Sequence, residues 1–417
     1  MRILLLADHN YRDTPALAAV QVEIEKISKH TVQVTDIHLF QQVAEIFKPH
    51  LVVINHLHDK NRNRIVDEIR RRGGLCAVLP TEGRPNTLGQ LEWAGKRFDT
   101  TLCDLYLSWS HEFVKYLDPS VKVEVTGCPR FSFYSKKYSR EQLASFYGLD
   151  IERPIITVAS SFPQAKFDGF AQEFLKNDWD NLGVSKIPGR EDPVKVAKED
   201  AVALRKFMSW IAACIHEYPE YQFVIKPHPA EDTLPWQQFC DEHNATLMLT
   251  DYIWNLLAMS DLHLARVGCL TAVESWLMDN RSIQLMCGGD FVDGPTLEAI
   301  EAGVVVADLR ELLEELVWLD DANDFEAQSA YIAKWLGEWM GDMEHSPSNV
   351  AKALVALLDD RKPETVFEYT NSDRISLNQV LAEHSKQHST PRPDRLNQFG
   401  KTVTQAGVRA WLEEIRQ

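Results

Sequence analysis

Short, almost entirely apolar runs recur through the first third of the chain, and stretches with helical spacing separate them. The apolar runs cover residues 2–7, 32–37, 50–55, 75–80 and 102–108. The stretches with helical periodicity cover residues 15–29, 59–72 and 87–96. Strands that are apolar on both faces and alternate with helices are typical of a parallel sheet covered by helices on both sides. The pattern therefore predicts an α/β domain over residues 1–150.

A second alternation of the same kind begins near residue 154. Strands are expected at 154–158, 222–225, 246–249, 262–265 and 282–286, and helices at 167–175, 196–218, 252–259 and 271–278. A length of 417 residues exceeds what one ordinary core buries, which agrees with two domains. We predict two Rossmann-like domains that face a cleft, over residues 1–150 and 151–362. The polar tail and last helix, 363–417, are expected to pack back onto the first domain.

Ligands of open parallel sheets bind at the carboxyl ends of the strands, so the loops there are the places to look for chemistry. The sequence contains neither G-x-G-x-x-G nor G-x-x-x-x-G-K-[S/T], which argues against dinucleotide enzymes and P-loop kinases. The acidic stretch 319–325 lies between helical segments and is interpreted as a solvated loop, not as a metal-binding Asp-x-Asp. Periplasmic-type binders, nucleotide-sugar epimerases and glycosyltransferases of the GT-B type remain.

Charge and cysteine content limit the possible binding partners and the cellular compartment. The 44 Lys and Arg against 61 Asp and Glu give a net charge of −17, which disfavours nucleic-acid partners and requires a local cationic pocket for any anionic ligand. Seven cysteines without a C-x-x-C pair favour reduced thiols in a cytoplasmic protein. The apolar run 3–7 is too short for a signal peptide or a membrane span. Contact with a membrane would then be peripheral, through partners or other domains.

The strand 222–225 ends in the motif 226-KPHPAED-232. Lys226 and His228 can both donate hydrogen bonds to a phosphate, and the two prolines between and after them fix the backbone. The alternative is a rigid turn with an exposed histidine. The acids Glu231 and Asp232 follow in the same loop and are candidate catalytic groups. Asp232 or the next residue could instead cap the following helix.

A second motif, 266-RVGCLTAVES-275, joins the strand 262–265 to a helix. A glycine turn at Gly268 followed by a helix start is suited to bind an anion, and Arg266 adds positive charge. Thr271 and Glu274 fit a T-x-x-E capping box, in which the glutamate binds the helix's own backbone. The functional alternative is that the Glu274 carboxylate accepts hydrogen bonds from ribose hydroxyls of a nucleotide.

Three further loops follow strands: 8-DHNYRDTP-15, 80-PTEGRP-85 and 158-VASSFPQAKF-167. Polar turns and helix caps explain the same residues without any function. Under the functional interpretation, Glu82 is a general base for an acceptor hydroxyl. The candidate contacts to donor or acceptor sugar in these loops are His9, Arg12, Arg84, Ser160, Ser161 and Lys166.

These motifs, together with 126-TGCPRF-131 and in this order, resemble the retaining β-Kdo transferases of bacterial lipopolysaccharide and capsule over roughly residues 1–360. Polysialyltransferases and teichoic-acid glycerophosphotransferases are similar more distantly. The resemblance implies a GT-B fold, a CMP-β-Kdo donor, no metal or other cofactor, and a product that retains the donor's anomeric configuration. His228, Thr271 and Glu274 occupy positions at which that family holds CMP.

Retention by double displacement needs a carboxylate that attacks the anomeric carbon. Asp232, four residues beyond His228, is our candidate nucleophile, and Arg84 would hold the Kdo carboxylate. The expected acceptor is a hydroxyl of a surface glycan, O-antigen or capsule, carried on a lipid at the inner face of the cytoplasmic membrane. A CMP-sialic acid or CDP-glycerol dependent transferase, and a non-catalytic or epimerase-like relative, are the alternatives. The sequence specifies neither the acceptor sugar and linkage nor the oligomeric state.

Overall fold

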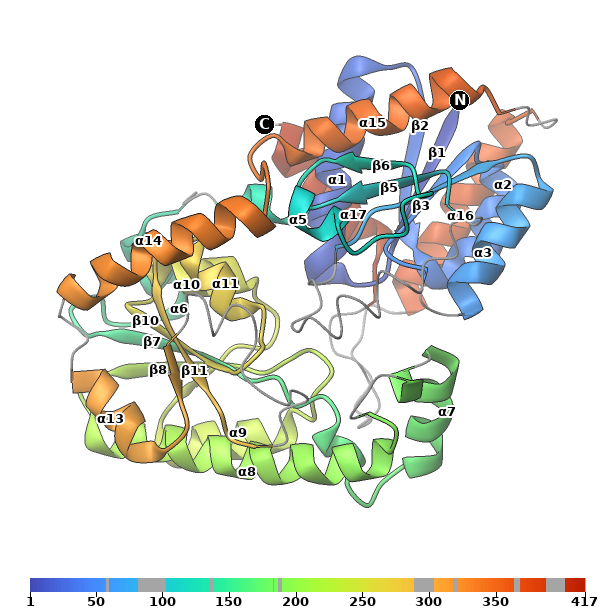
Figure 1. Cartoon of the computed structure of the whole chain (residues 1–417). Coiled ribbons are helices and arrows are strands. Elements are labelled where there is room, and N and C mark those ends of the chain that lie inside the picture. Colours follow the sequence, from blue (N-terminus) through green and yellow to red (C-terminus); the bar gives the residue numbers. More distant parts are fainter. Residues whose placement is uncertain are drawn as a thin grey trace.

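Two parallel six-stranded sheets form the centres of two domains (Figure 1). The computed structural model describes residues 1–57, 60–81, 103–134, 138–182, 184–186, 190–288, 304–317, 322–363, 368–387 and 402–416. Every strand pair in both sheets is parallel, in the register that repeated strand–helix crossovers produce. The prediction of two Rossmann-like domains is confirmed.

The first sheet has the strand order β2-β1-β3-β4-β5-β6. Its strands are β1 (Arg2–Ala7), β2 (Thr31–Asp36), β3 (Leu51–Ile54), β4 (Leu75–Val78), β5 (Leu105–Ser108) and β6 (Val123–Val125). The helices in this part of the chain are α1 (Asn10–Ile27), α2 (Phe40–Phe47), α3 (Lys60–Arg71) and α5 (His111–Val114). The helix expected at 87–96 lies outside the described residues.

The second sheet has the order β12-β11-β10-β7-β8-β9. Its strands are β7 (Ile155–Ala159), β8 (Gln222–Lys226), β9 (Thr246–Leu247), β10 (Leu262–Arg266), β11 (Arg281–Leu285) and β12 (Val304–Val306). Its helices are α6 (Arg140–Tyr147), α7 (Gln172–Leu182), α8 (Pro193–Glu217), α9 (Leu234–His243), α10 (Ile253–Met259), α11 (Thr271–Trp276), α13 (Leu309–Val317) and α14 (Ala322–Trp339). Because β7 lies between β8 and β10, the loops after these three strands leave the sheet side by side.

The chain returns to the first domain after α14. Helices α15 (Ser346–Arg361) and α17 (Gln405–Arg416) pack on α1, and α16 (Asn371–Gln387) packs on α2. Val350, Leu354 and Leu358 of α15 are fully buried in the same apolar cluster as β1. Figure 1 shows α15 with the first domain. The return therefore begins with α15, earlier than the predicted start of the tail at residue 363.

Two glycines allow the returning chain to cross the turn after β6. Gly127 (φ +73°) and Gly341 (φ +64°) adopt left-handed backbone conformations, and their backbones lie against each other. A Cβ atom on Gly127 would lie 2.1 Å from the carbonyl oxygen of Asp342, and one on Gly341 would lie 2.3 Å from that of Trp109. Both connections between the domains therefore pass through one close backbone contact.

All seven cysteines lie in the described part of the chain, and none of them forms a disulfide. Within that same part, no helix combines the length and the apolar character needed to cross a membrane. Both findings agree with the sequence analysis.

Candidate active site

A cavity of about 290 Å³ lies between the two domains. The second domain contributes the loops at the carboxyl ends of β7, β8 and β10, and the first domain contributes the start of α1 and the turn after β6. The lining residues predicted from the sequence are His9, Arg12, Ser160, Ser161, Lys226, His228, Gly268, Thr271 and Glu274. Such a volume lies at the lower end of the range of small-ligand sites.

The turn after β8 presents two donors to this cavity. Nδ1 of His228 accepts the N–H of Ala230 (3.1 Å), so the neutral imidazole carries its proton on Nε2, which is then a donor. The Lys226 ammonium donates to the carbonyl oxygen of Leu249 (3.0 Å) and lies 5.6 Å from the ring centre of Tyr11. Burial lowers the pKa of Lys226 to about 8. The proline-flanked turn therefore combines a fixed imidazole with an ammonium group.

Glu231 lies behind this turn and holds two neighbouring loops together. Its carboxylate, 4% exposed, accepts hydrogen bonds from Ser160 Oγ (2.8 and 2.9 Å), the N–H of Phe162 (2.7 Å) and Trp236 Nε1 (2.7 Å). Burial raises the pKa of Glu231. The carboxylate joins the loop after β7 to the loop after β8. We therefore correct its predicted catalytic role to a positioning role, because this buried carboxylate accepts from these three donor groups and does not line the cavity.

Arg266 is also a structural group. It is 3% exposed, and its guanidinium donates to the Asp200 carboxylate (2.5 Å) and to the carbonyl oxygen of Ser161 (2.7 Å). It also lies over the ring of Phe162, 4.3 Å from its centre. These contacts hold the loop after β7 from inside, so Arg266 does not line the cavity as the phosphate prediction required. Neither does Lys166, which is 6% exposed with its ammonium over the Phe167 ring.

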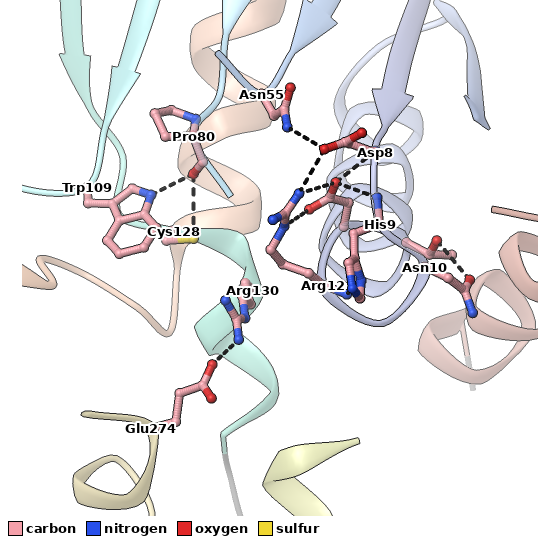
Figure 2. A network of polar contacts seen from close by, with 12 residues as sticks. Asp8, His9, Asn10, Arg12, Asn55, Pro80, Trp109, Cys128, Arg130 and Glu274 are labelled. Carbon is pink, nitrogen blue, oxygen red and sulfur yellow. Dashed lines mark hydrogen bonds and ion pairs between the residues drawn. The ribbon is translucent and has the colours of Figure 1, made fainter. Parts of the chain in front are cut away.

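Glu274 makes an ion pair across the domain boundary. Arg130, in the turn after β6, donates to the Glu274 carboxylate, which is fully buried (Figure 2). The predicted capping box is absent: Leu270 occupies the N-cap position of α11, and no side chain there bonds the helix start. Arg130 was not identified from the sequence, although it lies within the quoted motif 126-TGCPRF-131. A buried pair between domains cannot be read from either motif alone.

The first domain's wall is organised by Asp13. Its carboxylate accepts the N–H groups of Asp8 (2.8 Å) and His9 (3.0 Å) and the guanidinium of Arg12 (2.6 and 3.2 Å). Figure 2 shows where Asp8, His9 and Arg12 lie in this network. Nδ1 of His9 in turn accepts the N–H of Arg12 (3.3 Å). The start of α1 therefore holds His9 and Arg12 in defined positions facing the second domain.

We expect the protein to lose the stabilisation from Asp13 between about pH 4 and pH 2. Burial alone would raise the pKa of Asp13, but the Arg12 guanidinium outweighs burial and lowers it from 3.8 to about 2. The contribution is complete above pH 4 and is lost as pH falls through the folded-state pKa; a shift of nearly two units corresponds to about 2–3 kcal/mol. The difference in thermal unfolding between wild type and Asp13→Asn should be largest at pH 6 and should shrink progressively as pH falls from 4 toward 2. An unchanged gap would contradict this, and Glu23→Gln on the same helix serves as the control.

The cavity lining also includes residues that the sequence analysis did not single out, among them Tyr11, Asp251, Tyr252 and Trp254. Tyr252 stacks on Trp254 (4.4 Å between ring centres), meets Tyr11 edge to face (5.2 Å), and accepts a hydrogen bond from Trp411 Nε1 of α17 (2.7 Å). Asp251 accepts from the Tyr147 hydroxyl (3.1 Å). One end of the cavity is therefore aromatic and carries a carboxylate.

Of the two other predicted catalytic residues, Asp232 and Glu82, the structure describes only Asp232. Asp232 is half-buried beside the cavity-lining turn, does not line the cavity itself, and accepts the N–H of Leu234 (3.2 Å). Leu234 is the first residue of α9, so this bond agrees with the alternative that Asp232 caps the helix. The role of Asp232 as nucleophile stays a prediction. Glu82 and Arg84 lie outside the described residues. Among the residues that are described, no group of three or more His, Cys, Asp or Glu side chains is arranged to hold a metal ion.

No protein-family model and no curated protein matches this sequence. Solved structures do share the fold. S. aureus MnaA, in a co-structure with UDP, has 11% identity and a TM-score of 0.54, over 86% of this chain and 97% of that one. UDP-GlcNAc 2-epimerase from Neisseria meningitidis, bound to UDP-GlcNAc, has 16% identity and a TM-score of 0.53 (86% and 100%). The wall teichoic acid polymerase TagF with CDPG has 11% identity and a TM-score of 0.52 (87% and 90%). The GT-B type of fold is thereby confirmed.

Proposed function

We propose that this chain is a glycosyltransferase that binds a nucleotide-activated sugar in the cavity between its domains. The observation that supports this best is the convergence of Lys226, His228 and the turn before Thr271 on one cavity, opposite His9 and Arg12. The Lys226 ammonium and Nε2 of His228 are hydrogen-bond donors at this cavity, which suits a phosphate-bearing ligand in a protein of net charge −17.

Lys226 and His228 would stabilise the negative charge that develops on the nucleotide phosphate as it leaves. The carbonyl oxygen of Leu249 holds the Lys226 ammonium, and the N–H of Ala230 holds the His228 ring, so little reorganisation is needed during the reaction. The aromatic end, with Tyr252 and Trp254, offers flat surfaces for a base or a sugar ring.

We further propose CMP-β-Kdo as the donor, on the basis of the resemblance to β-Kdo transferases. The Asp232 carboxylate attacks the anomeric carbon, the bond to the CMP phosphate oxygen breaks, and CMP leaves. An acceptor hydroxyl then displaces the carboxylate and gives its proton to a base, for which Glu82 is the candidate. Two displacements restore the donor's anomeric configuration. The acceptor is a lipid-linked glycan at the inner face of the cytoplasmic membrane.

A second candidate function draws on the solved structures. MnaA with UDP, the Neisseria meningitidis UDP-GlcNAc 2-epimerase with UDP-GlcNAc, and TagF with CDPG share this fold over most of their length. Epimerisation of UDP-GlcNAc or transfer from CDP-glycerol would use the same phosphate-binding side of the cavity. Neither needs Asp232 as a nucleophile, so the two candidates differ in that residue as well as in the substrate.

Turnover with four activated substrates separates these functions. The purified protein is incubated with CMP-Kdo, CMP-sialic acid, CDP-glycerol or UDP-GlcNAc, and nucleotide release and product are measured. Release of CMP from CMP-Kdo alone supports the proposal. Conversion of UDP-GlcNAc without an acceptor establishes an epimerase, and glycerol phosphate transfer establishes the TagF-like function. Failure of CMP, CDP and UDP alike to bind in calorimetry would refute every version of it.

Nucleotide affinity is expected to fall as pH rises through about 8. The pKa of Lys226 is lowered to about 8, so above that pH the protein must take up a proton to pair with the phosphate. Affinity should be level from pH 6.5 to 7.5 and then fall by up to about tenfold per pH unit. Calorimetric titration of the tightest-binding nucleotide at pH 6.5–9.5 measures this. Lys226→Arg, which stays charged, should give a level profile; a falling profile in that variant would assign the titration to another group.

A further inference from the structure

A buried histidine lies directly behind the start of α11. His263, on β10, is 0% exposed, and its two ring nitrogens have different partners. Nδ1 is 3.1 Å from the carbonyl oxygen of Thr157 on β7, and Nε2 is 2.9 Å from the hydroxyl oxygen of Thr271. Thr271 itself lines the cavity. A residue with no access to a ligand therefore contacts a residue that faces one.

The direction of these hydrogen bonds follows from the chemistry of the partners. Burial lowers the pKa of His263 to about 3, so the ring is neutral and has one donor and one acceptor nitrogen. The Thr157 carbonyl can only accept, so Nδ1 carries the proton. Nε2 is then an acceptor, and the Thr271 hydroxyl must donate to it.

A hydroxyl has one proton and two acceptor lone pairs. Because the Thr271 proton is directed at His263, the hydroxyl has none left for a ligand. The Cys269 thiol is 3.1 Å from the same oxygen, and it must be the donor in that contact. One lone pair of Thr271 then remains for the cavity. A Thr271 hydroxyl that donates to a phosphate would need the opposite polarity.

We propose that His263 is a positioning residue that makes the Thr271 hydroxyl a hydrogen-bond acceptor toward the ligand. An acceptor repels a phosphate oxygen and attracts a hydroxyl proton, so Thr271 recognises a ribose hydroxyl of the nucleotide. Phosphate recognition is left to Lys226 and His228. The choice of ligand group rests on the proposed function; the direction of the hydrogen bonds in the protein does not.

The first test uses the protein without any nucleotide. Long-range ¹H–¹⁵N spectra distinguish a protonated from an unprotonated ring nitrogen, and the signal absent from His263→Gln assigns the residue. We expect a protonated Nδ1 and an unprotonated Nε2 between pH 6 and 8. A protonated Nε2 would overturn the inference, whatever the protein binds. This result is independent of whether the proposed function is correct.

The second test measures the affinities of CMP, 2′-deoxy-CMP and 3′-deoxy-CMP by calorimetry. Thr271→Val should weaken CMP binding by about 3- to 10-fold, the equivalent of one hydrogen bond, and leave unchanged the binding of the deoxy nucleotide that lacks the recognised hydroxyl. Thr271→Ser should bind like wild type. Equal weakening for all three nucleotides would refute recognition of a ribose hydroxyl. If none of them binds to wild type, the CMP version of the proposed function fails, whereas the tautomer result stands.

Variants of His263 show whether the histidine sets this preference. Gln can place its carbonyl oxygen near the position of Nε2 and accept from Thr271, whereas Phe removes the acceptor and releases the hydroxyl proton. His263→Phe should therefore lose the preference for CMP over the deoxy nucleotide, and His263→Gln should keep it. Circular dichroism verifies that both variants fold, and an unchanged preference in folded His263→Phe would count against the positioning role. Assignment of the ring signals uses folded His263→Gln, and the tautomer itself is read from the wild-type ring.

Discussion

The Arg130→Met variant is expected to lose about 3–5 kcal/mol of stability, because it leaves the Glu274 carboxylate buried without its cation. Glu274 is 0% exposed, and Arg130 reaches it from the other domain. The loss should appear in the association of the domains, so differential scanning calorimetry should show a lower first transition or the splitting of one transition into two. Nucleotide affinity should fall as well, since both residues line the cavity.

The matched variant is Arg130→Met combined with Glu274→Met. Removing both charges removes the uncompensated carboxylate, so the double variant should recover most of the stability while nucleotide affinity stays low. Arg140→Met is the control for an arginine lost from the surface, because its partner Asp261 is partly exposed. A double variant no more stable than Arg130→Met would show that the pair acts through packing and not through charge.

The Asp232→Asn variant is expected to reduce sugar transfer by about 10³-fold or more, because an amide cannot act as the nucleophile of a double displacement. Nucleotide affinity should change little, since Asp232 does not line the cavity. The amide oxygen of the variant can still accept the hydrogen bond from the backbone N–H of Leu234. A loss of rate without a loss of binding therefore separates catalysis from folding.

Intact-mass analysis with CMP-Kdo and no acceptor tests the same residue directly. Wild type should gain the mass of one Kdo, and Asp232→Ala should not. Asp241→Asn on α9 is the control, because Asp241 is an exposed acid that bonds only the nearby Gln237 in the described contacts. Full turnover by Asp232→Ala would exclude this residue as the nucleophile and would favour the epimerase-like or glycerol-phosphate alternatives.

Most strands were readable from the sequence because a strand buried on both faces is a continuous apolar run. The runs expected at 2–7 and 282–286 correspond to Arg2–Ala7 and Arg281–Leu285, and the helix expected at 196–218 corresponds to Pro193–Glu217. The return of α15 to the first domain could not be predicted. An amphipathic helix shows that it covers an apolar surface but not which of two similar sheets provides it.

The sequence predicted which residues lie near the cavity from their position at strand ends. It did not predict which of them are engaged by buried hydrogen-bond partners. Lys226, His228 and Thr271 follow strand ends, and strand ends of neighbouring parallel strands meet at one edge. Arg266 and Glu231 follow strand ends too, but each has a buried partner, Asp200 for one and Trp236 for the other. Those partners come from α8 and α9, and nothing in the local motifs indicates that they lie within hydrogen-bonding distance.

The glycine contact between residues 127 and 341 has a consequence for movement of the domains. Because both connecting segments pass through this one contact, a rotation centred there would change the cavity's width. The Arg130–Glu274 pair lies three residues beyond Gly127, close to such a centre, whereas His9 and His228 approach the cavity from separate domains. Small rotations would then alter the distance between His9 and His228 more than the ion pair, so substrate entry and closure could occur with that pair intact.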